Sequence, residues 1–274
     1  MILNGRAIAE GIYKELATRR AGIKRPVRLG IIVGGHDPVI ESFVRIKARA
    51  AARLDVDMVR IDLSAHATTE NAIDAVRDLS KKTDALIVQL PLPAGRRGFL
   101  GVDTNAVLSE IPHAKDVDVI NPRHSGVLAI VEAPVALAVV ELLKRGGVDI
   151  AGKKTVVVGA GRLVGAPSAV LLQKLGADVS MFTLDEGSIE DLKDADIVVC
   201  GAGNPGFIKP EHLKYGVALI DAGASEDGGM VRGDADPSCA KIASVFTPVP
   251  GGVGPVAVAM IFKNLFDIVE KAKL

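Results

Sequence analysis

The stretch KTVVVGAGRLVGAPSAVLLQKL, residues 154–175, decides the fold of this chain. An aliphatic run at Lys154–Val158 predicts a buried strand, the glycines Gly159, Gly161 and Gly165 follow it, and helical spacing comes next. Such a turn lets the backbone approach a pyrophosphate, and the helix N-terminus supplies N–H donors. The segment therefore predicts a Rossmann-type dinucleotide site. Because the spacing is G-x-G-x-x-x-G, a turn needed only for helix packing is the alternative.

Strands and helices alternate on both sides of this motif. The β-α-β-α-β rhythm of the N-terminal part predicts a parallel sheet with right-handed crossovers. We predict two α/β domains with a cleft between them. These are an N-terminal catalytic domain with a parallel sheet, residues 1–135 plus a returning helix within 256–274, and a C-terminal Rossmann domain, residues 136–255. Predicted strands are 27–33, 57–63, 85–90, 154–158, 178–182, 196–200, 217–220 and 245–246; predicted helices are 2–20, 38–54, 70–79, 134–145, 166–175 and 256–273.

Composition excludes several classes of protein. Among 274 residues, 33 Lys+Arg balance 33 Asp+Glu, and aromatic residues make up 3%, so a nucleic-acid partner is not expected. The apolar window 126–143 contains Glu132, Pro134 and Glu141, so no membrane span is expected. Cys200 and Cys239 lack the spacing of a disulfide framework or a metal site. Charge comes too early for a signal peptide. We predict a cytoplasmic protein without a metal.

Lys47 is a cation within an apolar stripe of the helix predicted at 38–54. At about 100° per residue, Phe43, Lys47, Ala50 and Leu54 share one face of this helix. One interpretation is a boundary lysine whose stem packs while its ammonium reaches water. The other is an amine that faces a cleft and takes part in proton transfer, its pKa lowered by desolvation. Spacing alone favours neither.

Polar residues also stand out near the ends of predicted elements. Gln89 lies at the carboxyl end of an aliphatic strand, the edge where ligands bind in open parallel sheets. Its amide is either tied to the neighbouring backbone or offered to a ligand. Asp116 and Asp118 alternate in KDVDVI, and either one of them points inward or both are solvated.

Taken together, these segments resemble the methylenetetrahydrofolate dehydrogenase/cyclohydrolase family over nearly the whole chain. VQLPLP (88–93) and TPVPGGVGP (247–255) resemble the two signatures of that family, and KDVD (115–118), GRLVGAPSAVLL (161–172) and FVRIK (43–47) resemble further motifs. The resemblance implies that Lys47 is catalytic, that Gln89 and Asp118 hold the pterin with Phe43 beside them, and that Pro250 and Gly251 line the substrate. It places Gly159, Ala160, Gly161 and Ala224 at the cofactor, and it implies a homodimer paired through Rossmann domains.

Three positions depart from the family pattern. Phe43 stands where the family has tyrosine, Val119 where it has glycine, and Gly159-Ala160-Gly161 where it has Gly-Arg-Ser, without the arginine associated with a cofactor phosphate. The second Rossmann strand ends in Thr183-Leu184-Asp185-Glu186, and a carboxylate there suits the 2′-hydroxyl of NAD. We therefore predict NAD or NADP as the cofactor, with NAD preferred; Arg162 is the residue that could favour NADP.

The predicted reaction is oxidation of 5,10-methylene-tetrahydrofolate to the 5,10-methenyl form by hydride transfer to NAD(P). A cyclohydrolase step giving 10-formyl-tetrahydrofolate is also predicted, with Lys47 moving protons and Phe43 weakening the step. The carrier is either tetrahydrofolate or a modified pterin. The alternatives are another two-domain oxidoreductase, similar to shikimate dehydrogenase, and a regulator that binds the cofactor without turnover.

Overall fold

The computed structural model describes residues 1–35, 37–96, 99–123, 130–183, 185–227 and 230–272. The chain forms two compact units. The three-stranded unit comprises Tyr13–Glu132 and Ile261–Leu274, and the five-stranded unit comprises Met1–Ile12 and Ala133–Met260. Two helices, α1 (Gly5–Gly22) and α7 (Val253–Lys271), each contribute to both units. The predicted domain boundaries at 135 and 256 differ from the bounds of these units, because the units divide within α1 and within α7. The predicted domains therefore stay a prediction.

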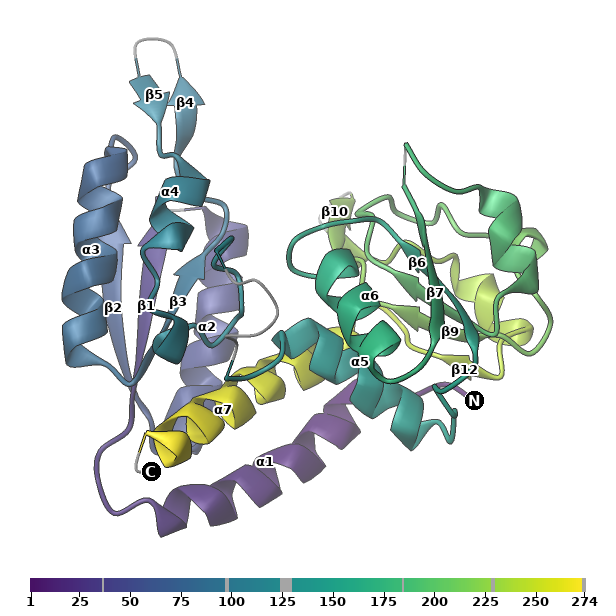
Figure 1. The fold of residues 1–274 in the computed structure, drawn as a ribbon, viewed down its shortest axis with the longest axis horizontal. Helices are drawn as coiled ribbons and strands as arrows, with labels where there is room; N and C mark the ends of the chain where they lie inside the picture. The colour runs from purple at the N-terminus through teal and green to yellow at the C-terminus, as the bar shows by residue number, and fades with distance from the viewer. Residues whose placement is uncertain (36, 97–98, 124–129, 184, 228–229, 273–274) are drawn as a thin grey trace. The chain divides into compact units, whose positions relative to one another are not determined.

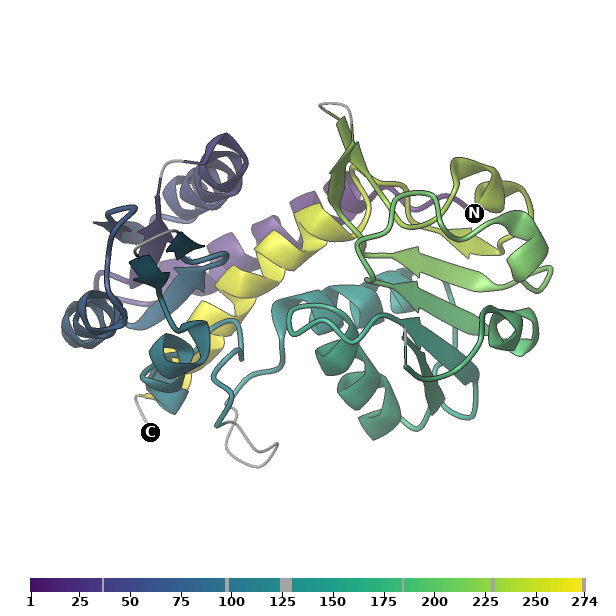
Figure 2. The same cartoon turned by 90° about the horizontal axis from the view of Figure 1, so that it is seen from above.

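A parallel sheet in the order β2-β1-β3 forms the core of the three-stranded unit, with α2 and α3 on opposite faces (Figures 1 and 2). In register, Val33 lies between Asp62 and Gln89, so the carboxyl ends of the three strands meet at one edge. The elements are β1 (Arg28–Gly34), α2 (Pro38–Arg53), β2 (Asp57–Leu63), α3 (Thr69–Lys82) and β3 (Ala85–Gln89).

Local sequence explains where α2 begins. Asp37 accepts hydrogen bonds from the backbone N–H groups of Val39 and Ile40, and Pro38 occupies the first turn. An aspartate cap satisfies donors that have no partner within the helix, and proline is preorganised for this position. The cap therefore fixes the residue at which α2 begins, while the packing of the helix against the sheet sets the direction in which Lys47 points.

Short elements follow β3. They are β4 (Ala94–Arg96), β5 (Phe99–Gly101), α4 (Thr104–Ser109) and the 3-10 helix η1 (His113–Lys115). Sequence periodicity did not predict them, because elements of three to six residues are too short to repeat a pattern. Lys115 donates to the backbone carbonyls of Ser80 and Thr83, at 2.5 and 2.7 Å, so it closes the end of α3. Residues 124–129, which include the first four positions of the apolar window 126–143, lie outside the described residues.

The sheet of the five-stranded unit is parallel, in the order β12-β9-β8-β6-β7. α5 and α6 pack together along one face and short 3-10 helices lie along the other (Figure 2). This arrangement confirms the predicted α/β fold class. The elements are α5 (Pro134–Arg145), β6 (Lys154–Val158), α6 (Gly165–Lys174), β7 (Asp178–Phe182), η2 (Ile189–Asp194), β8 (Ile197–Cys200), η3 (Pro210–His212), β9 (Ala218–Asp221), β10 (Ser225–Asp227), β11 (Met230–Arg232), η4 (Pro237–Lys241) and β12 (Val245–Phe246).

Residues on alternate positions of the central strands fill the core of this unit. Val156 and Val158 of β6 pack with Leu192 of η2 and Cys239 of η4, all nearly inaccessible to solvent. Val157 between them is also buried, at 0% exposure. A strand buried on both faces reads as an unbroken aliphatic run, as seen in the sequence. None of the described helices is both long enough and apolar enough to span a lipid bilayer.

Candidate functional site

Lys47 and Gln89 meet at the carboxyl edge of the three-stranded sheet. The Lys47 Nζ donates a hydrogen bond to Oε1 of Gln89 at 2.8 Å, and Nε2 of Gln89 donates to the Leu90 carbonyl at 2.9 Å. The amide is therefore tied to the backbone and also holds the amine. The ammonium is directed to a protein acceptor rather than only to water, which excludes a lysine that merely snorkels.

Asp118 is the third member of this cluster. Burial lowers the pKa of Lys47 from its ordinary value, and the negative charge of Asp118 partly opposes the shift. Burial also raises the pKa of Asp118 to about 6; the Lys47 charge opposes this rise and Asp116 adds to it. Burial therefore moves the two pKa values toward each other, as expected of an amine and a carboxyl that take part in proton transfer.

The stripe predicted on α2 is wrong at Phe43. Ala50 and Leu54 are buried, but Phe43 is 42% exposed, because the buried face of the helix is centred on Ile40 and Val44. Phe43 instead shares an exposed apolar stripe with Val39 and Ile46, which are 42% and 46% exposed. Aromatic and aliphatic side chains exposed next to a polar cluster suit a ring-shaped ligand.

Asp116 of KDVD points inward, so a pair of solvated acids is wrong. Asp116 is 1% exposed and accepts a hydrogen bond from the Asn121 N–H at 2.9 Å, while Asp118 is half-buried. Between them, the Val117 carbonyl accepts a hydrogen bond at 3.0 Å from Nδ2 of Asn264, a buried residue of α7. Sequence reasoning missed Asn264. The signal was available, because it is a lone amide in the apolar turn IFKNLF.

Val119 has a φ of 56°, in the left-handed region, which a β-branched side chain rarely adopts. Such a conformation persists only where the surrounding structure imposes it. Glycine adopts it without strain, which explains why a glycine fits the family pattern here. The turn after Asp118 is therefore retained in this chain at a cost in stability.

We expect Val119→Gly to lower the free energy of unfolding less than the same change at a half-buried valine with ordinary backbone. Both changes remove the contacts of a valine side chain and add glycine entropy to the unfolded chain, but only at Val119 does glycine also relieve left-handed backbone, which costs a residue with a side chain about 1–2 kcal/mol. Urea titration of both proteins measures the difference. Val102→Gly is the matched control, because the half-buried Val102 has no left-handed φ and its loss should destabilise the protein. An equal loss of stability in both variants would contradict the prediction.

Within the five-stranded unit, the glycine turn fits a dinucleotide. The Gly159 N–H donates to the Phe182 carbonyl at 2.8 Å, which holds the turn against the end of β7. A Cβ on Gly159 would lie 2.7 Å from the Gly201 carbonyl oxygen, and one on Gly165 would overlap the Gly159 carbonyl. A Cβ on Gly161 would meet only the Gly201 oxygen at 3.8 Å. Packing requires the first and third glycines, while the second leaves the space that a phosphate needs.

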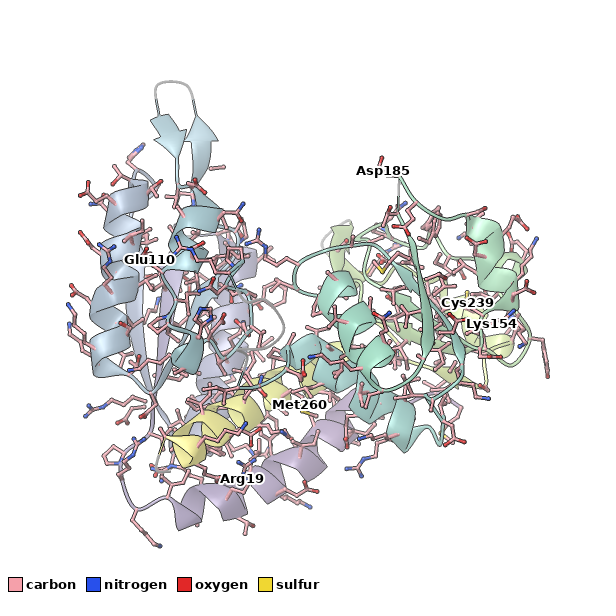
Figure 3. The ribbon with its side chains drawn as sticks, viewed as in Figure 1. Arg19, Glu110, Lys154, Asp185, Cys239 and Met260 are labelled. Carbon is pink, nitrogen blue, oxygen red and sulfur yellow. The ribbon has the colours of Figure 1, made fainter. Side chains whose placement is uncertain are left out.

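The other predicted cofactor residues lie along the same carboxyl edge. Thr183 follows β7, and its Oγ1 accepts from the backbone N–H groups of Asp185 and Glu186, at 3.2 and 3.1 Å. Figure 3 shows Asp185 extending beyond the end of β7. Ala160 and Arg162 are exposed in the glycine turn, and Ala224 is exposed after β9. Leu184 lies outside the described residues.

The candidate residues fall into two groups, one in each unit. Lys47, Gln89 and Asp118 come together in the three-stranded unit. The predicted cofactor residues lie in the five-stranded unit, as do Pro250 and Gly251, in the loop before α7. Gly251 has a φ of 106°, which a residue with a side chain rarely adopts. Among the described residues, no group of three or more His, Cys, Asp or Glu could hold a metal ion.

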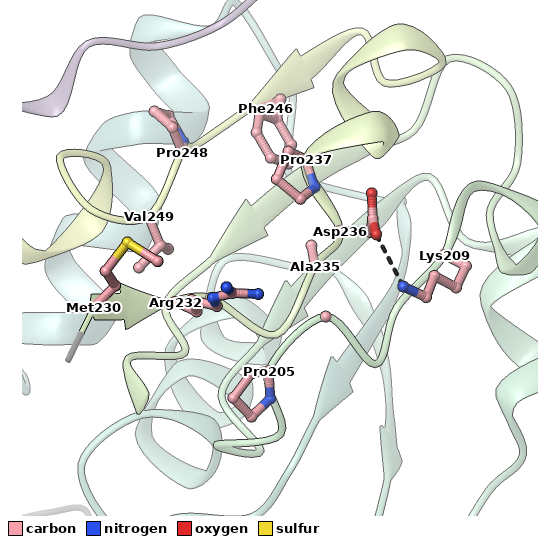
Figure 4. A pocket seen from close by; sticks show the side chains of 12 residues that line it. Pro205, Lys209, Met230, Arg232, Ala235, Asp236, Pro237, Phe246, Pro248 and Val249 are labelled. Carbon is pink, nitrogen blue, oxygen red and sulfur yellow. Dashed lines mark hydrogen bonds and ion pairs between the residues drawn. The ribbon is translucent and has the colours of Figure 1, made fainter. Parts of the chain in front are cut away.

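A separate cavity of about 410 Å³ lies in the five-stranded unit (Figure 4). Lys209 and Asp236 form an ion pair at its wall, with Nζ and Oδ2 2.9 Å apart. None of the predicted site residues lines this cavity. Its lining residues are Pro205, Gly206, Lys209, Met230, Arg232, Gly233, Ala235, Asp236, Pro237, Phe246, Pro248 and Val249.

Both units of the chain match the domains of one known protein family. Residues 3–118 match the catalytic domain of tetrahydrofolate dehydrogenase/cyclohydrolase, and residues 133–273 match its NAD(P)-binding domain. The chain belongs to the tetrahydrofolate dehydrogenase/cyclohydrolase family. The two matches cover most of the chain, so the resemblance seen in its motifs is confirmed, as is the expectation of a nicotinamide-dependent enzyme.

Individual members of the family are similar over the full length. The "Bifunctional protein FolD" of Halothermothrix orenii is 37% identical to this chain, over 96% of this chain and 95% of the relative's length. The protein of the same name from Methanoculleus marisnigri is 36% identical, over 97% of this chain and 95% of the relative's length. The Trypanosoma brucei methylenetetrahydrofolate dehydrogenase-cyclohydrolase, solved with NADP and an inhibitor, has a TM-score of 0.92 at 33% identity, over 100% of this chain and 98% of that one.

Proposed function

We propose that this member of the family oxidises 5,10-methylene-tetrahydrofolate to the 5,10-methenyl form and then hydrolyses that product to 10-formyl-tetrahydrofolate. The observation that carries the proposal is the hydrogen bond from Lys47 to Gln89 at the edge of the sheet. Gln89 orients the amine, and the charge of Asp118 acts on the same amine, so an oriented amine and a carboxylate lie together. Matches to the family at both units support it. A bound nicotinamide would accept the hydride.

In the first step the chain orients two rings and needs no strong base, because the two nitrogens beside the bridge carbon stabilise the cation that forms. Asp118 accepts hydrogen bonds from pterin N–H groups. In the second step water adds to the bridge carbon, and Lys47 moves protons between water and the pterin nitrogen as the ring opens. Gln89 keeps Nζ of Lys47 in place through the 2.8 Å hydrogen bond.

The deciding experiment follows the methenyl absorbance after methylene-tetrahydrofolate is mixed with the protein and each nicotinamide. A rise with NAD or NADP supports the proposal. An oxidoreductase similar to shikimate dehydrogenase would reduce a nicotinamide with a hydroxy acid and not with the folate. A regulator without turnover would bind both ligands and produce no methenyl band. Repeating the assay with a modified pterin distinguishes the two carriers.

We expect NAD to support faster initial rates than NADP at equal concentration. Two features favour NAD. Ala160 offers no cation in the glycine turn, and Asp185 places a carboxylate after β7, where it would repel a 2′-phosphate. Asp185→Ala should shift the ratio toward NADP, whereas Asp178→Ala, at the amino end of the same strand, should leave it unchanged. Higher wild-type rates with NADP would overturn this expectation.

The KM for methylene-tetrahydrofolate should rise as the pH falls through about 6. Burial raises the pKa of Asp118 to about 6, so the carboxyl takes up a proton at a pH where an ordinary aspartate is still ionised. A protonated carboxyl loses part of its capacity to accept pterin N–H donors. Between about pH 7 and about pH 5, KM should increase roughly tenfold. Asp118→Asn should give a high, flat KM profile, while the exposed Asp74→Asn should keep the wild-type profile.

Three further expectations belong to this proposal. The chain forms a homodimer through its five-stranded unit, residues 1–135 with 256–274 behave as the catalytic domain, and the enzyme is cytoplasmic. Light scattering of the purified chain tests the first expectation, because a monomeric mass at assay concentration would contradict it. Limited proteolysis that releases a fragment beginning near residue 136 would support the second.

A further inference from the structure

Asp234 is a fully buried carboxylate that accepts hydrogen bonds from the backbone of one loop, residues 201–204. Its Oδ2 accepts from the N–H groups of Ala202 and Gly203, at 2.7 and 3.2 Å, and its Oδ1 accepts from Asn204 at 2.8 Å. The side chain is 0% exposed. Burial of a carboxylate is costly unless donors compensate it, so three consecutive donors on one group indicate a loop whose shape is fixed.

A second carboxyl supports the first. Asp221, which ends β9, accepts from the N–H groups of Ala235, Gly223 and Asp234 itself, at 2.8, 3.0 and 3.2 Å. Burial raises the pKa of Asp221 to about 7, and the neighbouring Asp234 adds to the rise. A proton on Asp221 near neutral pH therefore relieves repulsion between the two groups. Figure 4 shows Pro205, which follows the loop, and Ala235, which follows Asp234, in the same part of this unit.

This loop, residues 201–204, follows β8 directly and contacts the glycine turn. The Gly201 N–H donates to the Val158 carbonyl at 2.9 Å, and the Gly201 carbonyl oxygen lies 2.7 Å from the position of a Cβ on Gly159. In a trans peptide unit the C=O points opposite to the N–H. The carbonyls of residues 201–203 therefore face away from Asp234.

Strand order indicates which part of a dinucleotide would lie over this loop. The sheet runs β9-β8-β6-β7, with the glycine turn after β6 and Asp185 after β7. A carboxylate after the second strand binds the adenosine ribose, and the glycine turn binds the pyrophosphate. The dinucleotide therefore crosses β6 from β7 toward β8, and its nicotinamide half comes to the loop. Ribose hydroxyls and the carboxamide N–H groups are donors that match carbonyl acceptors.

We propose that Asp234 is a positioning residue for the nicotinamide half of the cofactor. It holds the 201–204 loop so that the carbonyls of residues 201–203 accept hydrogen bonds from the ribose hydroxyls and the carboxamide. The inference rests on the proposed function only in requiring a nicotinamide cofactor. It does not depend on which substrate is oxidised.

The test compares two ligands by titration calorimetry on the full chain. NAD contains the nicotinamide half, and ADP contains only the adenosine and pyrophosphate half. Asp234→Asn replaces one acceptor oxygen with a donor NH₂ group that faces the loop amides. The Kd of NAD should rise roughly tenfold, because the loop must be ordered at binding, while the Kd of ADP should change less than about twofold. Methenyl hydrolysis without a nicotinamide should stay at the wild-type rate.

Asp236→Asn is the matched control. It removes a nearby carboxylate that pairs with Lys209 and has no hydrogen bond to the loop. Gly203→Ala is the second variant and keeps Asp234. Gly203 has a φ of 72°, and its Cβ would meet only the Ser225 Oγ at 3.6 Å, so the alanine changes the loop conformation without a clash. It should also weaken NAD and spare ADP, and it replaces Asp234→Asn if that variant fails to fold.

Two outcomes would overturn the proposal. One is an unchanged Kd for NAD in both variants. The other is an equal loss of NAD and ADP affinity, which would assign Asp234 a structural role alone. A wild-type protein that binds NAD but does not oxidise the folate would contradict the proposed function and leave this inference standing.

Discussion

Lys47→Ala should lower the rate of methenyl hydrolysis about a thousandfold, within the range of about 10²–10⁴ typical of general acid–base catalysis. Ring opening requires a group that takes up and releases protons, and burial lowers the pKa of Lys47 toward the assay pH. Alanine removes the amine and leaves the Gln89 amide oxygen without its 2.8 Å partner. Decay of the methenyl absorbance without a nicotinamide measures this step alone.

Two comparisons make this result specific. Arg45→Ala removes a cation from the exposed side of the same helix and should leave hydrolysis unchanged. The dehydrogenase rate of Lys47→Ala should fall much less than its hydrolysis rate, because hydride transfer depends on positioning. A variant that keeps more than about a tenth of wild-type hydrolysis would rule out Lys47 as the proton-transfer group.

Phe43→Tyr should raise hydrolysis by up to about a hundredfold, the effect of one positioned hydrogen bond worth ~3 kcal/mol in a catalytic site. Phe43 precedes Lys47 by four residues on α2, so the two side chains are neighbours on the helix surface. The ring is 42% exposed, so a hydroxyl group can be added without burial of an unpaired polar atom. It would supply the donor and acceptor that phenylalanine lacks.

Wild-type protein should therefore hydrolyse methenyl-tetrahydrofolate more slowly than it oxidises the methylene form. Phe43→Leu is the control variant, because it keeps an apolar side chain and adds no hydroxyl. It should not raise hydrolysis. The interpretation of Phe43 fails if wild-type hydrolysis matches the dehydrogenase rate, or if the tyrosine leaves hydrolysis unchanged.

Elements with long, uniform patterns were predictable from sequence. The strands at 57–63, 154–158 and 178–182 have the predicted bounds. At 154–158 the signal is an aliphatic run that is buried almost throughout, whereas 57–63 and 178–182 are mostly half-buried and interrupt their apolar residues with polar ones. The glycine turn was equally readable, because its glycines come directly between a buried strand and a helix in the sequence. Short elements in 94–115 were not readable, because no periodicity develops over so few residues.

The sequence by itself determined the fold class, the dinucleotide turn and the identity of the polar candidates, because these depend on patterns between neighbouring residues. Only the tertiary structure decided what those candidates contact. In the folded chain Lys47 donates a hydrogen bond to Gln89, 42 positions away in sequence. Phe43 is exposed to solvent, and Val119 has a strained, left-handed backbone. Asp234 accepts hydrogen bonds from a loop that lies about 30 residues earlier in the chain. Contacts of this kind depend on strand order and helix rotation, which the packing of the whole sheet sets.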